Sequence, residues 1–180
     1  MRGPEELFEQ LEAQLHQQSR PPVHLWSPES VGRIDIRIAR DGSWHHQGSP
    51  ITRAAMVQAF ASVLCHDEDG YALVTPVEKL LIEVEDTPFV AVDCDTRGQG
   101  RDMDLMFTTN TGELVMADDA HPLSVSTTGR GAYPVVEVRP GLTARIAQAV
   151  YYRLVELGVE EGGELVLYSA GSRFSLGSLT

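Results

Sequence analysis

The stretch that decides the fold runs from residue 32 to residue 89 and reads GRIDIRIARDGSWHHQGSPITRAAMVQAFASVLCHDEDGYALVTPVEKLLIEVEDTPF. Isoleucines alternate with charged residues over 34–38, and Asp41-Gly42 follows them, which is the pattern of a strand that enters a tight hairpin. A segment with the helical period of 3.6 residues begins after Pro50. A hairpin followed directly by a helix predicts an α+β fold in which the sheet and the helix share one core.

The remainder of this stretch predicts strands that pack on the helix. A polar turn at 67–70 separates the helix from the first of these strands. Strands are expected at 71–74, 80–85 and 89–93, because each is an apolar run bounded by Gly, Pro or polar residues. We expect these strands to form one meander packed on the helix. The residues expected on the buried side of the helix are Met56, Phe60, Val63 and Leu64.

The second half of the chain follows a similar order. A hairpin is expected around the turn Asn110-Thr111-Gly112, and a strand over 135–138 leads into another helix. This helix is predicted over 142–157, where apolar residues recur at spacings of three and four, and Gly158 is placed to end it. Short strands over 164–168 and 173–176 complete this half.

The order of hairpin, proline, helix and strands therefore occurs twice, which makes an internal duplication a hypothesis. We predict an α+β fold of two related sheet-plus-helix repeats packed together and preceded by an N-terminal amphipathic helix. The expected boundaries are 1–22 for that helix and its linker, 23–95 for the first repeat and 96–180 for the second. A cleft would naturally form at the junction of the repeats. The apolar face of the N-terminal helix consists of Leu7, Phe8, Leu11 and Leu15.

The charge of the chain argues against binding to nucleic acid. Its formal net charge is −12, whereas affinity for DNA or RNA depends mainly on Lys and Arg side chains that neutralise phosphates. No apolar run approaches the length of about 20 residues that spans a membrane, and the acidic N-terminus is unlike a secretory signal. We therefore expect a cytoplasmic protein that binds neither nucleic acid nor membranes.

Signatures of several enzyme and cofactor classes are missing from the sequence. It has no P-loop, no Gly-x-Gly-x-x-Gly after a strand and no Gly-x-Ser-x-Gly turn. Cys65 and Cys94 lack the spacing of a zinc knuckle or a disulfide framework. A calcium-loop register over 93–104 has Arg97 at a ligand position, and His45-His46 points to opposite faces of a strand. We expect no cofactor and no metal, and we name no catalytic residue.

A set of short motifs occurs in a fixed order and spacing along most of the chain. These motifs are Trp26-Ser-Pro-Glu29, Gly32-x-Ile-Asp-Ile36, Asp41-Gly-x-Trp44, Gly48-x-Pro-Ile51, Arg53, Thr75-Pro-Val-Glu-Lys79, Glu85-Asp-x-Pro-Phe89, His121-Pro122, Arg139-x-Gly-Leu142, Ala144-Arg145 and Tyr151. Together they resemble a bacterial family known as domain of unknown function 1285, and the resemblance covers about residues 24–175. It implies a fold of repeated α+β motifs and a part in signal transduction, and it brings no activity. One departure is Gln148, which stands where the family pattern tends to have a second Arg three residues after Arg145.

Basic residues within these motifs are the candidates for a ligand site. Arg53 and Arg145 are expected near the starts of the two helices, and Arg presents a planar fork of donors suited to carboxylate or phosphate. His121 precedes a rigid proline and can change its charge near neutral pH. The alternative is that each arginine pairs with an acid and serves only structure. The candidate ligand-binding residues are Arg53, Lys79, His121, Arg139, Arg145 and Tyr151.

Three functions remain open on this basis. The first is a binding or regulatory module, active in signal transduction, that senses a small anionic ligand at the junction of the repeats. The second is a protein-interaction module that uses its acidic surface and N-terminal helix to engage a protein partner or a second copy. The third is an enzyme, which we favour least because no pair of nucleophile and base is recognisable.

Overall fold

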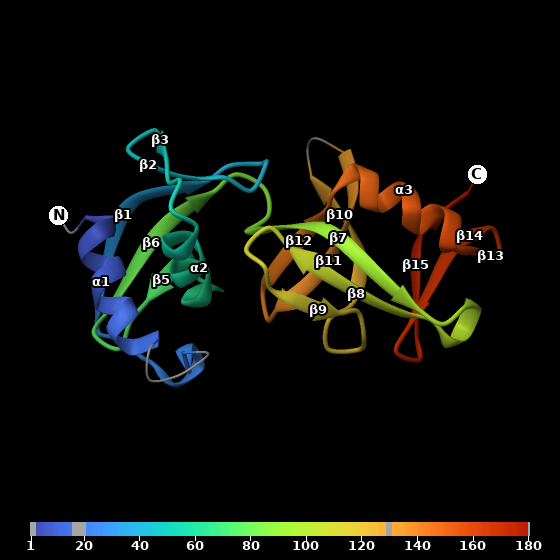
Figure 1. Cartoon of the computed structure of the whole chain (residues 1–180), viewed down its shortest axis with the longest axis horizontal. Helices are drawn as coiled ribbons and strands as arrows, with labels where there is room; N and C mark the ends of the chain where they lie inside the picture. Colours follow the sequence, from blue (N-terminus) through green and yellow to red (C-terminus); the bar gives the residue numbers. More distant parts are fainter. Residues whose placement is uncertain (1–2, 16–20, 129–130, 180) are drawn as a thin grey trace. The chain divides into compact units, whose positions relative to one another are not determined.

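The structure of this protein is a computed structural model that describes residues 3–15, 21–128 and 131–179 (Figure 1). The side chain of Leu15 and residues 16–20 of the expected linker lie outside the described part. Contacts divide the chain into two units, Met1–Asp86 and Thr87–Thr180. Each unit contains a six-stranded sheet, and the second also has a three-stranded sheet. The α+β class is therefore confirmed.

The sheet of the first unit has the order β3-β2-β1-β6-β5-β4. Neighbouring strands are antiparallel except at the centre, where β1 and β6 run parallel. The alternation expected over 34–38 is correct, because Ile34, Ile36 and Ile38 are all buried. The elements are α1 (Pro4–Leu15), η1 (Val23–Leu25), β1 (Ser30–Ile38), β2 (Trp44–His46), β3 (Ser49–Pro50), α2 (Ala54–Ser62), β4 (Leu64–Asp67), β5 (Gly70–Val74) and β6 (Glu78–Val84).

The helices of the first unit contribute to its core. Phe60 of α2 is fully buried, and its ring centroid lies 6.2 Å from that of Trp44. Helix α1 contacts α2 and buries Leu7, Phe8 and Leu11, as its apolar face predicted. Helix α1 is therefore part of the first unit.

The second unit repeats the sheet connectivity of the first, with the order β10-β11-β12-β7-β8-β9. In each unit two antiparallel meanders join through a parallel pair, formed by the first strand of one meander and the last strand of the other. The helix differs in position, since α2 lies between the meanders whereas α3 follows both and leads to a third meander. The elements are β7 (Phe89–Arg97), η2 (Gly100–Asp102), β8 (Asp104–Thr109), β9 (Leu114–Met116), β10 (Leu123–Thr128), β11 (Gly131–Arg139), β12 (Leu142–Ile146), α3 (Gln148–Leu157), β13 (Val159–Glu161), β14 (Glu164–Ser169) and β15 (Ser172–Ser178).

Three expectations about elements are wrong. The helix expected to bury Val63 and Leu64 ends at Ser62, because residues 64–67 form β4 and pair with β5. The helix predicted to begin at 142 begins at Gln148, because residues 142–146 form β12 with alternate residues buried. A spacing of four fits a strand as well as a helix, since it is also a multiple of two. The strand at 89–93 does not join the meander of β4, β5 and β6. It forms part of β7, which pairs with β8 and β12.

The pairing of β7 also sets the division of the chain. Because β7 belongs to the second sheet, the boundary falls between Asp86 and Thr87, whereas the sequence predicts it after residue 95. Thr87 is buried, and its hydroxyl donates to the carbonyl of Phe89 and accepts from the N–H of Arg145. None of the described helices has the length and apolar character needed to cross a bilayer.

Candidate functional site

The predicted site residues of the first unit are held by other side chains. Arg53 is the N-cap residue of α2, and its guanidinium lies 4.5 Å from the ring centroid of Phe8. The ammonium of Lys79 lies 2.6 Å from Asp67 and 2.8 Å from Asp69. Hydrogen bonds to these two carboxylates, first that of Asp67, raise the pKa of Lys79. The positive charge of Lys79 is thus already matched by acids.

Arg139 and Arg145 of the second unit lie toward opposite faces of its sheet. Arg145 is in β12, not on a helix, and its guanidinium lies 5.7 Å from the ring of Tyr133. The guanidinium of Arg139 lies 5.6 Å from the ring centroid of Phe89. Phe89 pairs with Ala144 of β12, so these two side chains lie on the same face of the sheet, whereas Arg145, the next residue, lies on the opposite face. Arg139 also lies 3.8 Å from a carboxylate oxygen of Glu113. The structure does not bring these two arginines together.

The last two predicted residues lie on different elements of the second unit. His121 lies in the loop between β9 and β10, where its Nδ1 is 2.9 Å from Oδ1 of Asp118. Tyr151 lies on α3, with its ring centroid 6.3 Å from that of Tyr152. The six residues are therefore divided between two units and several elements. A shared anion site built from them stays a prediction.

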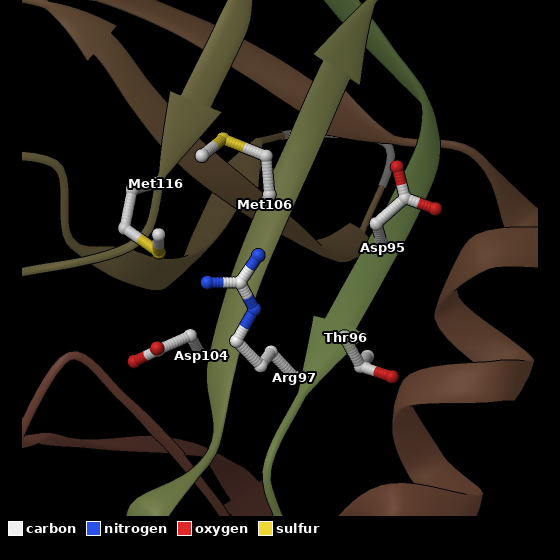
Figure 2. A pocket seen from close by; sticks show the side chains of 6 residues that line it. All are labelled: Asp95, Thr96, Arg97, Asp104, Met106 and Met116. Carbon is white, nitrogen blue, oxygen red and sulfur yellow. The ribbon is translucent and has the colours of Figure 1, made fainter.

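A pocket of about 310 Å³ lies instead on β7, β8 and β9, on the face of these strands that turns away from the core (Figure 2). The strand register builds it. Asp95 is the partner of Met106, which is the partner of Met116, and Arg97 is the partner of Asp104. Figure 2 shows the Arg97 side chain extended between the methionines and Asp104. The lining residues are Asp95, Thr96, Arg97, Asp104, Met106 and Met116.

The charged groups of this pocket differ in whether other residues of the chain already bind them. Among the residues that the structure describes, neither Arg97 nor Asp95 takes part in an ion pair. Asp104 is held in place, because its Oδ1 accepts a hydrogen bond of 3.1 Å from the N–H of Ala170 in the turn between β14 and β15. The pocket thus offers the guanidinium of Arg97 as a hydrogen-bond donor and the carboxylate of Asp95 as an acceptor for a ligand.

The backbone that follows Arg97 is tightly fixed. Gly98 has a φ of +79°, and a Cβ added there would lie 2.3 Å from the carbonyl oxygen of Asp102. The next element, η2, contacts β14. The guanidinium of Arg101 in η2 lies 5.6 Å from the ring of Tyr168. Only glycine fits this turn without strain, and the turn sets where β7 ends and Arg97 points.

Glu161 links η2 to the three-stranded sheet. The Tyr168 hydroxyl donates to its carboxylate at 2.8 Å, and Nε of Arg173 lies 3.0 Å from the same group. These hydrogen bonds, first that of Tyr168, lower the pKa of Glu161. Nη2 of Arg101 lies 3.4 Å from Glu161. A charged cluster outside the pocket therefore joins η2, the element that follows Arg97 and Gly98, to the three-stranded sheet.

A smaller hollow of about 220 Å³ lies where α3 meets β7. Cys94 lines it, and burial raises the pKa of its thiol to about 12. Arg153 pairs with Asp93 at 2.5 Å beside it. A thiol with a raised pKa is a poor nucleophile, so this hollow offers little chemistry. In the described ranges, no group of three or more His, Cys, Asp or Glu residues is arranged to hold a metal ion.

Sequence reasoning missed the Arg97 pocket. Residues 93–104 suggested only a calcium-loop register, in which Arg97 is the misfit. The available signal was the alternation of Asp95 and Arg97 on one face of a strand, opposite the alternation of Asp104 and Met106. That signal needs the pairing register of β7 and β8, because alternation alone does not say which side chains face each other.

Comparisons with known proteins agree with the division into units. A family model described as the N-terminal domain of DUF1285, a domain of unknown function, matches residues 21–87. The C-terminal domain model of the same family, described as a protein of unknown function, matches residues 88–176. A search among curated proteins gave no match.

Two solved structures are similar to this chain. The crystal structure of a DUF1285 family protein from Silicibacter pomeroyi DSS-3 has 46% sequence identity and a TM-score of 0.85, covering 94% of this chain and 95% of that chain. A DUF1285 family protein from Shewanella baltica OS155 has 30% identity and a TM-score of 0.54, covering 67% of this chain and 90% of that chain. Both family models together match most of the sequence. This chain therefore belongs to the DUF1285 family.

Proposed function

We propose that this protein is a small-molecule-binding module, with a regulatory role, whose ligand presents an anionic group to Arg97. The observation that carries the proposal is the guanidinium of Arg97, which opens onto a pocket and forms no ion pair with any other described residue. A guanidinium donates several hydrogen bonds in one plane and suits a carboxylate or a phosphate. The basic residues singled out from sequence are less suited, since Lys79 is engaged by two aspartates.

The size and lining of the pocket favour a small ligand. Its volume of about 310 Å³ lies at the lower end of the range of about 300–1,000 Å³ that is usual for ligand pockets. Met106 and Met116 form an apolar floor beside the charged groups. Methionine adapts to ligands of different shape, because its side chain is unbranched and polarisable. The ligand therefore combines an anionic group with an apolar part.

The methionines also provide the test. The protein is labelled with methyl-¹³C methionine and titrated with three sets of compounds: small carboxylic acids, phosphorylated metabolites and amino acids. We expect at least one set to shift the methyl signals of Met106 and Met116 saturably. The signal of Met56, which is buried in α2 of the first unit, is expected to stay in place.

Two variants with the same loss of charge separate the site from the protein as a whole. Arg97→Gln is expected to abolish the shifts. Arg33→Gln removes an exposed arginine from β1 in the first unit and is expected to leave them unchanged. If no compound in the three sets moves the signals of Met106 and Met116 saturably, the proposal is wrong.

A further inference from the structure

The charge balance of the Arg97 pocket indicates a more specific ligand than an anion. One guanidinium and two carboxylates, those of Asp95 and Asp104, line the pocket. The whole chain carries a formal net charge of −12, so its field also disfavours the approach of anions. A ligand that carried only negative charge would gain one contact at Arg97 and be repelled by the two acids. A ligand that also carries an ammonium group would turn one of these repulsions into an attraction.

Resting on the function proposed above, we infer that the ligand is a zwitterion of the α-amino acid type with an apolar side chain. Its carboxylate binds Arg97, its ammonium binds Asp95, and its side chain lies over Met106 and Met116. Such a ligand has no net charge, so the long-range field of the acidic protein does not oppose its binding.

The strand geometry places the two charged partners at a suitable separation. Asp95 and Arg97 are two residues apart in β7, so their side chains leave the same face with Cα atoms about 6.6 Å apart. An α-amino acid carries its ammonium and carboxylate on the same carbon, and the long Arg97 side chain can reach across the remaining gap. Met106 is the direct ladder partner of Asp95, so the apolar floor begins beside the ammonium site.

The choice of Asp95 over Asp104 follows from their hydrogen bonds. Oδ1 of Asp104 accepts from the backbone N–H of Ala170, and this bond fixes the carboxylate as part of the pocket wall. The Asp95 side chain makes no ion pair with the rest of the described chain. An ammonium ion donates up to three hydrogen bonds and is best matched by a carboxylate that is not already in use.

Three forms of one probe isolate the contribution of the ammonium. Leucine carries both charges, N-acetyl-leucine keeps the carboxylate without the ammonium, and leucine methyl ester keeps the ammonium without the carboxylate. Dissociation constants come from the methyl signals of Met106 and Met116. We expect leucine to bind up to about fivefold more tightly than either derivative, since a solvent-accessible ion pair contributes up to about 1 kcal/mol.

The variant Asp95→Asn provides an independent arm with nearly unchanged shape. It is expected to weaken leucine binding about fivefold and not to weaken N-acetyl-leucine binding, because loss of the Asp95 charge removes a repulsion from the anionic compound. Retained binding of N-acetyl-leucine also shows that the variant is folded. Arg97→Gln is expected to weaken both compounds.

The outcomes separate this inference from the broader proposal. Equal affinities for leucine and N-acetyl-leucine, or an unchanged affinity of Asp95→Asn for leucine, overturn the zwitterion inference and leave an anion-binding module. Saturable binding of phosphorylated metabolites with no binding of leucine has the same meaning. If no compound of any set shifts the two methionine signals, both the inference and the proposed function fail.

Discussion

Replacing Gly98 by alanine tests whether the turn after Arg97 is as tight as the structure shows. Two costs are expected. The φ of +79° lies in the left-handed region, which costs a residue with a Cβ about 1–2 kcal/mol. The added Cβ would also lie 2.3 Å from the backbone oxygen of Asp102, and backbone cannot rotate away as a side chain can. Forcing an atom into such a contact costs about 1–3 kcal/mol more.

Gly100 provides a matched control two residues away. Its φ is +58°, but a Cβ added there would have no heavy atom within 4 Å. Gly100→Ala therefore carries the conformational cost of about 1–2 kcal/mol without the steric one. The difference between the two variants isolates the contact with Asp102, and we expect Gly98→Ala to be less stable by about 1–3 kcal/mol.

The assay is urea denaturation followed separately in the two units. Both tryptophans, Trp26 and Trp44, lie in the first unit, so their fluorescence reports on that unit. The methyl signals of Met106 and Met116 report on the second. We expect the midpoint of the methionine signals to fall in Gly98→Ala with little change in the fluorescence midpoint. If Gly98→Ala is no less stable than Gly100→Ala, the turn after Arg97 is not closed against Asp102.

Three further predictions concern the core, a thiol and a charged pair. Phe60→Ala is expected to destabilise the first unit by about 3–5 kcal/mol in urea denaturation, because the ring is fully buried. In a Cys65→Ser protein, Cys94 is expected to react with a thiol reagent at pH 8 about a thousandfold more slowly than an ordinary thiol, since its pKa is raised to about 12. Lys79→Met is expected to lower the urea midpoint near neutral pH. The loss should shrink as the pH falls below about 4, because the hydrogen bond from Lys79 lowers the pKa of Asp67 in the folded state.

Each of these has a control and a contrary result. Val77 is 63% exposed, so Val77→Ala, the control for Phe60→Ala, should change stability by less than about 0.5 kcal/mol. A change as small as this in Phe60→Ala would contradict the packing described for Phe60. Cys94 should react at the ordinary rate in unfolding concentrations of urea, and rapid reaction of the folded protein would show that the thiol is accessible. A carboxyl group whose pKa is lower in the folded state stabilises the protein at pH values above its unfolded pKa. This contribution is lost as the pH falls through the folded pKa. If the difference in urea midpoint between Lys79→Met and the unchanged protein stays constant down to pH 3, the result contradicts the pairing of Lys79 with Asp67.

The local features of the fold were predictable from sequence. The alternation over 34–38, the hairpin at Asp41-Gly42 and the helix after Pro50 all depend on residues close together in the chain. The turn at Gly112 is of the same kind, and its glycine has a φ of +87°. Such turns need a backbone conformation that few residues other than glycine adopt readily, so the sequence marks them directly.

Pairing between distant strands was not predictable in the same way. β7 was expected beside β6, its predecessor in the chain, but its parallel partner is β12. Nothing local in an apolar run such as 89–93 specifies a partner more than fifty residues later. Residues 142–146 were predicted as helix for a different reason: their apolar spacing fits both the helical and the strand period.

The candidate site shows the same limit in its side chains. Arg and Lys were selected for charge, yet a charged side chain is available to a ligand only if no acid or aromatic ring already engages it. Lys79 lies against two aspartates and Arg53 lies over a phenylalanine ring. Arg97 differs because its ladder partner Asp104 is turned to a backbone N–H of another strand pair. Only the three-dimensional arrangement distinguishes these cases.

The Arg97 pocket lies on the half of β7 that extends beyond its pairing with β12. Along β7, residues 89–91 pair with β12, but β12 stops at Ile146 and the chain turns into α3. β7 continues to Arg97, and within the described residues its far half pairs with β8 alone. The pocket uses the other edge of β7, because its remaining lining residues come from β8 and β9. The ladder with β8 fixes Asp95 and Arg97 on an ordered strand, which is the arrangement a binding site on a rigid element requires.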